Sequence, residues 1–343
     1  MAESIWISRV SNLGRNISRL YGAKWSCSIV TLILCFFLWS AGAFAGSKTL
    51  VCVLVPHFKD EYWLSVGYGL EQEAARQDVE ILFFEAGGYR ARIRQIEQLG
   101  LCVDRGVDVI LIGAVTSDHP DLIQAIADVA QTTPVFSLVN ELRSDALGAR
   151  IGLDWRDMGN AVGRYLAELH PSGSPSRTAL LISGPSEAGW PSPLESGLRD
   201  GIAASSVAIV EVSGADTGLR QQLALVETAL DRYPDVDYLI GSAPAIEAAM
   251  GLLSAKSDKK YPRLISTYIS HTVLRGLMNG SVEAAPFDDP VLQGIQAIQQ
   301  VMQSRAPNHS APTGGPKVSL LTHADRTVDQ VRISPADYFP NIQ

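Results

Sequence analysis

The sequence predicts an α/β protein with two lobes, each built on a doubly wound parallel sheet. From residue 49 onward, short β-branched runs alternate with amphipathic segments of roughly 12 to 18 residues, the pattern of right-handed βαβ units. The runs are almost entirely apolar, as expected of strands covered by helices on both faces. Eleven such runs in a chain of 343 residues are too many for one ordinary sheet, so two lobes of five or six strands are expected.

The expected strands lie at 50–55, 80–84, 107–113, 134–138, 149–153, 178–183, 208–212, 237–241, 263–267, 281–285 and 317–321. The expected helices lie between them, at 62–77, 90–105, 118–130, 157–168, 191–204, 218–232, 244–254, 270–279 and 288–304. After residue 305, the run APNHSAPTGGPK predicts a loop-rich return that carries the last strand.

The first 45 residues differ in composition from the rest. An apolar run, IVTLILCFFLWSAGAFA, follows four basic residues: Arg9, Arg15, Arg19 and Lys24. Its last three residues, 43–45, form a small-x-small cleavage pattern, so we predict a secretory signal peptide over residues 1–45 that is cleaved before Gly46. The alternative is an uncleaved membrane anchor, because the apolar run is close to spanning length.

Two cysteines remain after such a cleavage. Cys52 lies in the first expected strand, and Cys102 lies near the end of a helix that would pack on the same sheet. In a chain exported to an oxidising compartment, the two are expected to form a disulfide. The alternative is a pair of buried thiols.

Composition and motifs argue against several function classes. The formal net charge of −8 disfavours nucleic acid as a partner. The six histidines show no paired metal-ligand spacing, and the chain has no G-x-S-x-G elbow, no P-loop and no G-x-G-x-x-G fingerprint. The serines of SGPSEAG have no assignable base. A binding protein without catalysis, metal or cofactor is therefore expected.

Aromatic residues recur just after the expected strands, where ligands bind in folds of this kind. The segments that follow six of these strands are PHFKDEYW, EAGGY, DW, GPSEAGW, Tyr268 and PFDD. In the first of them, Asp60 can cap a helix whose first turn carries Tyr62 and Trp63. These residues are expected to line one cleft.

Several motifs together resemble the type I periplasmic binding proteins, and among these the sensors of trimethylamine N-oxide. The motifs are KDEYWLSVGYGLEQEAAR, EAGGY, PDL, GRYLAE, IEAAMG, YISHTVLRGL and ADR, and the similarity extends over about residues 48 to 335. The resemblance implies a periplasmic receptor that binds trimethylamine N-oxide between its two lobes. It also implies signalling to the periplasmic domain of a membrane-bound sensor histidine kinase.

The resemblance implies a ligand site and a hinge with three crossings. The matching ligand positions are Asp60, Tyr62, Trp63, Tyr89, Trp155 and Tyr268, whereas Trp190 stands where the family tends to have a small residue. The expected N-terminal lobe comprises 47–153 plus 286–310, and the C-terminal lobe comprises 154–285 plus 311–343. Crossings near residues 153, 285 and 310 would form the hinge.

The chemistry of the matched residues agrees with such a ligand. Aromatic faces attract a positively charged, methylated nitrogen, and hydroxyl or indole N–H groups donate to its oxide, a role expected of Tyr62. The main alternative is a sugar-binding component of an ABC transporter. Such proteins commonly place Asp-Asn near the first crossing, where this chain has Asp154-Trp155. A periplasmic hydrolase is an alternative of a different class.

Overall fold

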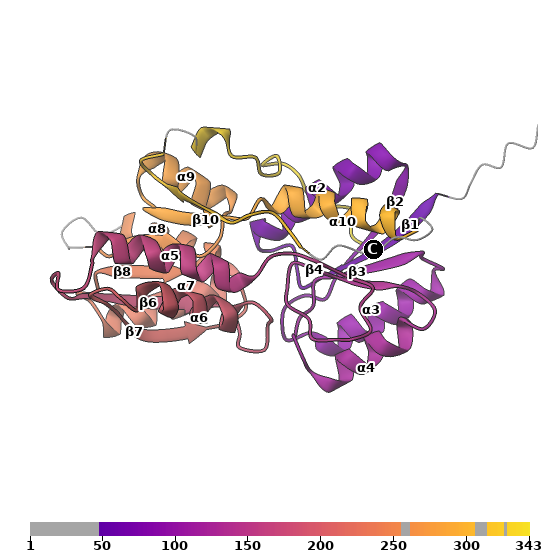
Figure 1. The fold of residues 1–343 in the computed structure, drawn as a ribbon, viewed down its shortest axis with the longest axis horizontal. Coiled ribbons are helices and arrows are strands. Elements are labelled where there is room, and N and C mark those ends of the chain that lie inside the picture. Colours follow the sequence, from indigo (N-terminus) through magenta and orange to yellow (C-terminus); the bar gives the residue numbers. More distant parts are fainter. Residues whose placement is uncertain (1–47, 255–260, 306–313, 326–327) are drawn as a thin grey trace, which may run out of the picture. The chain divides into compact units, whose positions relative to one another are not determined.

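A computed structural model describes residues 48–254, 261–305, 314–325 and 328–343. The predicted signal peptide and its cleavage site lie outside the described residues. In the described part the strands form two sheets, one of five strands and one of six (Figure 1). The predicted α/β class with parallel sheets is confirmed.

The first sheet has the strand order β2-β1-β3-β4-β5, and all its neighbours pair in parallel. Its strands are β1 (Thr49–Val55), β2 (Val79–Glu85), β3 (Val109–Ile112), β4 (Val135–Leu138) and β5 (Ala149–Ile151). The helices between these strands are α2 (Glu61–Gln77), α3 (Arg92–Asp104) and α4 (Pro120–Val129).

The second sheet has the order β11-β10-β9-β8-β6-β7, and only its edge strand β11 runs antiparallel. Its strands are β6 (Arg177–Ser183), β7 (Val207–Gly214), β8 (Tyr238–Gly241), β9 (Arg263–Ser266), β10 (Ala284–Phe287) and β11 (Ser319–Thr322). Its helices are α5 (Trp155–Leu169), α6 (Pro191–Ile202), α7 (Leu219–Arg232), α8 (Ala243–Ser254) and α9 (His271–Asn279). The last helix, α10 (Pro290–Ser304), returns to the first sheet, and the short helix η1 (Val328–Gln330) lies by α9.

The apolar strands are explained by burial on both faces. Alternate residues of β1 point to opposite sides, so Val51 and Val53 join the core that includes α2 and α10, whereas Cys52 and Leu54 join the core under α3 and α4. A strand buried in this way has no polar face, which is why the sequence shows runs rather than alternation.

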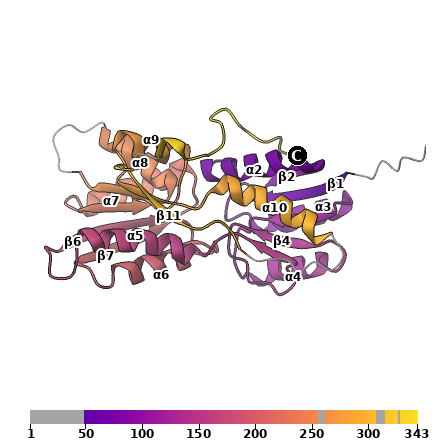
Figure 2. The same ribbon diagram turned by 45° about the horizontal axis from the view of Figure 1, so that its top comes forward.

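Helices α2 and α10 come from distant parts of the sequence and lie side by side in both views (Figures 1 and 2). Two glycines allow their backbones to touch. A Cβ at Gly69 would lie 2.0 Å from the carbonyl oxygen of Val291, and one at Gly294 would lie 2.2 Å from that of Val66. This close contact fixes α10, and the crossing before it, against the helix that opens the site.

The end of the chain differs from the expectation that residues 311–343 belong wholly to the second lobe. Strand β11 pairs with β10 there, but Ile342 bridges Phe83 of β2, and the backbone N–H of Gln343 donates to the carbonyl of Phe83 at 2.9 Å. Because β2 is the edge of the first sheet, its outer backbone groups are free to accept a returning segment. The tail therefore connects the two sheets once more.

Cys52 and Cys102 are joined by a disulfide that ties β1 to α3. Both side chains are fully buried in the core under α3 and α4. The bond lies away from the strand ends where ligands bind in this fold, so its role is structural.

We predict that Gly294→Ala destabilises the protein by about 1–3 kcal/mol, because the added methyl meets backbone that has no flexible end to move aside. Gly100→Ala is the matched control. It lies in helix α3 with nothing within 4 Å of its Cβ position, and it should stabilise by about 0.5–1 kcal/mol. Urea unfolding of both variants checks this, and similar shifts for the two would contradict the close contact.

We predict that reducing the disulfide lowers the free energy of unfolding by about 4 kcal/mol, because the bond spans 50 residues of sequence and restricts the unfolded chain. Unfolding of the wild type with and without reductant measures the loss. Cys52→Ala/Cys102→Ala is the control and should be insensitive to reductant. Two alkylated thiols in unreduced protein would show that the bond does not form.

Candidate functional site

Loops at the carboxyl ends of strands from both sheets converge on one small cavity. They follow β1, β2, β4 and β5 in the first sheet and β6, β7 and β9 in the second, the position at which open α/β sheets bind ligands. Ten residues line the cavity, and six of them are aromatic: Asp60, Tyr62, Trp63, Tyr89, Val139, Asn140, Trp155, Trp190, Thr217 and Tyr268.

The first turn of α2 supplies two of the aromatic walls. Asp60 is its N-cap and accepts a hydrogen bond from the backbone N–H of Tyr62 at 3.1 Å. The ring of Trp63 packs over Gly113 at the end of β3, where a Cβ would come within 2.3 Å of the indole. The indole of Trp63 therefore fits at the start of the helix, because the strand end beside it has no side chain.

The hydroxyl of Tyr62 is engaged at the crossing before α10. It donates to Asp288 Oδ2 at 2.6 Å and accepts from Gln293 Nε2 at 3.0 Å. Burial raises the pKa of Asp288 to about 6, although both of these neighbours lower it by hydrogen bonding. Because the Tyr62 hydroxyl is already bonded to Asp288 and Gln293, the part of Tyr62 that is available to a ligand is its ring.

The rings pack mainly edge to face. The Tyr62 and Tyr268 centroids lie 5.4 Å apart at 76°, and those of Trp190 and Tyr268 lie 5.9 Å apart at 87°. The rings of Trp155 and Trp190 are tilted by 42° at 5.4 Å. Contacts of this kind hold each ring in place, so the walls form one packed unit drawn from both lobes.

Trp155 is fixed by the crossing between β5 and α5. It is the first residue of α5, whose N-cap is Asp154. Its indole N–H donates to the carbonyl oxygen of Val139 at 3.2 Å. Val139 has φ of 65°, a backbone conformation that is unusual for a β-branched residue and that occurs most often at functional sites. Trp155 therefore also presents its ring face, because its N–H is already bonded.

One wall of the cavity carries a carboxyl group. The hydroxyl of Tyr268 donates to Asp60 Oδ2 at 2.6 Å, a hydrogen bond that joins the two lobes. Burial raises the pKa of Asp60, and the Tyr268 hydrogen bond and the charge of His57 oppose that shift. Burial and the nearby Asp60 raise the pKa of Tyr268 well above its ordinary value, so Tyr268 remains a donor.

The hydroxyl of Tyr89 marks the polar part of the cavity. Asn140 Nδ2 donates to the carbonyl of Ala114 at 2.9 Å and approaches the Tyr89 hydroxyl at 3.4 Å. Burial raises the pKa of Tyr89, and the side chains of Asn140, Trp63 and Trp190 beside its hydroxyl oppose that shift. Polar groups thus gather at one point, opposite apolar ring faces.

The cavity is tight. The centre of a water-sized sphere can move over only about 10 Å³ within it. So small a space among six rings suits a compact ligand that is poor in hydroxyl groups better than a sugar ring.

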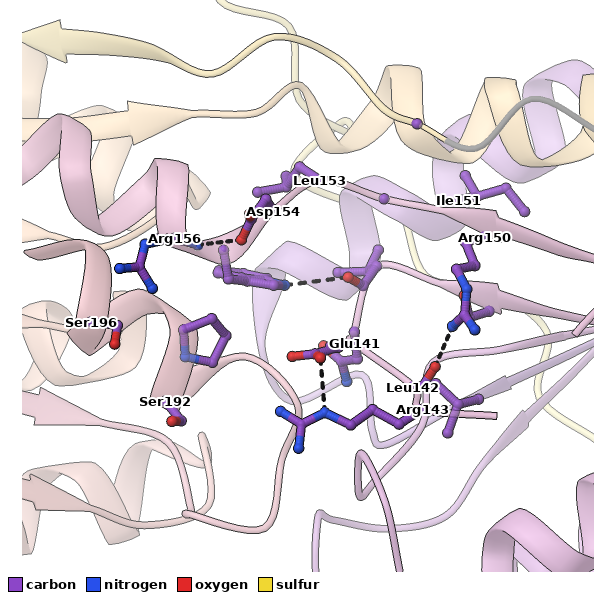
Figure 3. Close-up of a pocket in the computed structure, with 17 residues that line it drawn as sticks. Glu141, Leu142, Arg143, Arg150, Ile151, Leu153, Asp154, Arg156, Ser192 and Ser196 are labelled. Atoms are coloured by element: carbon purple, nitrogen blue, oxygen red, sulfur yellow. Dashed lines mark hydrogen bonds and ion pairs between the residues drawn. The ribbon is translucent and has the colours of Figure 1, made fainter. Parts of the chain in front are cut away.

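A wider pocket opens beside the cavity (Figure 3). In it, the same sphere's centre can move over about 620 Å³. The figure shows Arg143 directed toward Glu141, and Ser192 and Ser196 on the second lobe. Val139, Asn140 and Trp155 border both spaces, so these three residues separate the small cavity from the open pocket.

All six ligand positions expected from the resemblance line the cavity, together with four residues outside that set. These are Val139, Asn140, Trp190 and Thr217. Trp190 carried a signal, since it ends the segment GPSEAGW after a strand, whereas nothing in the sequence distinguishes Asn140 or Thr217 from ordinary loop residues.

The described residues contain neither a metal-binding cluster nor a membrane-spanning helix. Across these residues, no group of three or more histidine, cysteine or acidic side chains is arranged to hold a metal ion. Over the same ranges, no helix has both the length and the apolar character needed to span a membrane.

Comparison with known proteins gives three closely similar relatives. The curated Periplasmic protein TorT of Escherichia coli K12 is 35% identical over 292 residues, covering 84% of this chain and 83% of TorT. A chain of the TorS sensor domain–TorT complex solved in the presence of TMAO is 35% identical with a TM-score of 0.75, covering 86% of this chain and 100% of that one.

The third relative is an ABC transporter solute binding protein from Bradyrhizobium sp. BTAi1, solved with bound bis-tris. It is 34% identical with a TM-score of 0.72, covering 87% of this chain and 90% of that one. Sugar-binding proteins such as the glucose-galactose binding protein of Geobacillus stearothermophilus, at 18% identity, share the fold.

Residues 48–340 match the family described as periplasmic binding proteins and sugar binding domain of LacI family. Because this match covers most of the sequence, the chain belongs to that family and is a periplasmic binding protein rather than an enzyme.

Proposed function

We propose that the protein is a periplasmic receptor for trimethylamine N-oxide that signals to the periplasmic domain of a TorS-like sensor histidine kinase. The observation that carries the proposal is the convergence of six aromatic rings and one carboxyl group on one small cavity. The similarity to TorT, at 35% identity over nearly the same length, supports the same ligand and partner.

The ligand would lie with its methyl groups against the rings of Tyr62, Trp155, Trp190 and Tyr268. Each ring face attracts the positive nitrogen by about 0.5–2 kcal/mol, depending on how far water is excluded. Asp60 adds negative charge on the same side. Asp60 and the other five positions taken from the sequence thus serve as ligand residues.

The oxide would point to the Tyr89 hydroxyl, beside which the side chains of Trp63 and Trp190 lie. We assign the oxide to Tyr89 rather than to Tyr62, because the Tyr62 hydroxyl already donates to Asp288. Trimethylamine N-oxide has no proton to donate, so a site that offers donors at one end and apolar faces elsewhere matches it.

The proposal also includes export of the chain by a signal peptide and a movement of the two lobes. Residues 1–45 would act as a cleaved signal peptide. The two lobes, 47–153 with 286–310 and 154–285 with most of the remaining tail, would open and close about their crossings. A ligand held between them favours the closed state in proportion to its differential affinity.

The second candidate function is a solute-binding component of an ABC transporter. The solute binding protein from Bradyrhizobium, at 34% identity, supports it almost as strongly as TorT supports the sensor. For a sugar ligand, the cavity offers few groups besides Asp60, Asn140 and Thr217 that could bond ring hydroxyls. Titration calorimetry with trimethylamine N-oxide, glycine betaine and pentoses separates the candidates, and tight binding of a pentose alone would overturn the sensor proposal.

We predict that Trp155→Ala and Trp63→Ala each weaken binding of trimethylamine N-oxide roughly five- to thirty-fold, the effect of losing about 1–2 kcal/mol. Trp155→Phe keeps a π face and should lose less. Phe339→Ala, at an exposed aromatic outside the cavity, is the control and should bind as the wild type does. If both tryptophan variants keep wild-type affinity while their melting temperatures fall, the rings are only scaffold.

We predict that the mature protein, used as bait, recovers a sensor histidine kinase from detergent-solubilised membranes. The expectation rests on the similarity to TorT in a complex with a TorS sensor domain. Mass spectrometry of the bound fraction, with and without trimethylamine N-oxide, identifies the partner. Recovery of transporter permease subunits instead would favour the solute-binding alternative.

A further inference from the structure

A carboxylate of the second lobe is bound by two loops of the first. Asp216 lies in the loop after β7, and its Oδ1 is 2.9 Å from His57 Nε2. Its Oδ2 accepts the backbone N–H of Tyr89 at 3.0 Å. His57 follows β1 and Tyr89 follows β2, so one side chain connects both ligand-site loops of the first lobe to the second lobe.

This contact is shielded from water and charged. The side chain of His57 is 0% exposed, and that of Asp216 is 19% exposed. Burial acts to raise the pKa of Asp216, but the hydrogen bond and charge of His57, the Tyr89 amide and the charge of Lys59 together lower it below its ordinary value. A carboxylate with two donors in a partly dry setting makes strong, charge-assisted hydrogen bonds.

The first lobe is shaped to receive this carboxylate. Gly88 has φ of +154°, and a Cβ there would lie 2.3 Å from Asp216 Oδ2. At the neighbouring Gly87, which also has a positive φ, a Cβ would meet nothing within 4 Å. Both positions favour glycine because of their positive φ, but only at position 88 would a side chain also block the approach of Asp216.

The contact adjoins the ligand cavity without being part of it. Asp216 is not among the residues that line the cavity, whereas Thr217 and Tyr89 are. The ring of His57 meets that of Tyr89 edge-on, with centroids 5.8 Å apart at 88°, and Thr217 Oγ1 lies 3.3 Å from His57 Nε2. Any shift of Asp216 would therefore reach Tyr89 through both its backbone and its ring.

We propose that Asp216 is a positioning residue that latches the two lobes together and holds Tyr89 in the cavity wall, without touching the ligand itself. Closure brings Asp216 onto His57 and the Tyr89 amide, and the same movement completes the aromatic cavity. The effect on ligand affinity rests on the proposed function, whereas the latch itself can be tested without ligand.

The first test is hydrogen exchange at the Tyr89 amide in the absence of ligand. Asp216→Ala removes both acceptor oxygens, and Gly88→Ala displaces the carboxylate, so both should speed exchange at this amide roughly tenfold or more. The controls are Asp235→Ala, at an exposed aspartate, and Gly87→Ala, which shares the strain of a positive φ but places its methyl where no atom lies within 4 Å. Unchanged exchange in Asp216→Ala, or equal acceleration in Gly87→Ala and Gly88→Ala, would overturn the latch.

The second test is calorimetric titration of the same variants with trimethylamine N-oxide. Asp216→Ala should bind roughly ten times more weakly, a difference of about 1.4 kcal/mol, with a far-ultraviolet circular dichroism spectrum like that of the wild type. Faster exchange with wild-type affinity would show that the contact does not serve the site and would overturn the proposal. A wild type that binds no trimethylamine N-oxide would refute the proposed function, and the exchange experiment would still decide on the latch.

Discussion

The ligand cavity depends on the backbone contact between α2 and α10. These helices are more than 200 residues apart in the chain, and each brings a different part of the site: the first turn of α2 carries the aromatic pair, and the start of α10 carries Gln293 beside Asp288. Gly69 and Gly294 allow the two backbones to meet, and the hydrogen bond from Tyr62 to Asp288 closes the gap at the cavity end. Packing density at such a contact is high, so a displacement of either helix would move a wall of the cavity.

The two buried carboxyl groups of the site are held in different ways. Asp288 takes hydrogen bonds from Tyr62 of α2 and Gln293 of α10, so neither of these bonds crosses to the second lobe. Asp60 takes one bond from its own helix cap and one from Tyr268 across the lobes. Opening the lobes would remove that second bond and return Asp60 to water. An isolated buried charge is costly, so Asp60 is better suited to a site that is dry only when it is closed.

Much of this arrangement could be read from the sequence, because strands buried on both faces and helices between them leave a strong periodic signal. The aromatic residues after the strands were predictable for the same reason, since position along a parallel strand fixes the edge at which its end lies. Contacts between loops were not predictable. Asp216 and Thr217 look like ordinary turn residues, and only the approach of β7 to the loops after β1 and β2 gives them a role. The position of the C-terminal tail was not predictable either. Ile342 pairs with the edge of β2, and which sheet edge is free depends on the tertiary structure rather than on the local sequence.

The balance between apolar walls and polar contacts suits a receptor that must open again. Trimethylamine N-oxide has five non-hydrogen atoms, and the best small ligands gain at most about 1.5 kcal/mol per atom, so roughly 7 kcal/mol is the most that binding can contribute to closure. Lobes held shut by a large apolar interface would not respond to so small a ligand. Around the cavity, however, the lobes meet through the polar pairs Asp60–Tyr268 and Asp216–His57 as well as through a few rings. The polar groups recover hydrogen bonds to water on opening, so each pair contributes only a modest net free energy to the closed state. Closure then stays within the range that the ligand can shift, and the few rings around the cavity decide which ligand shifts it.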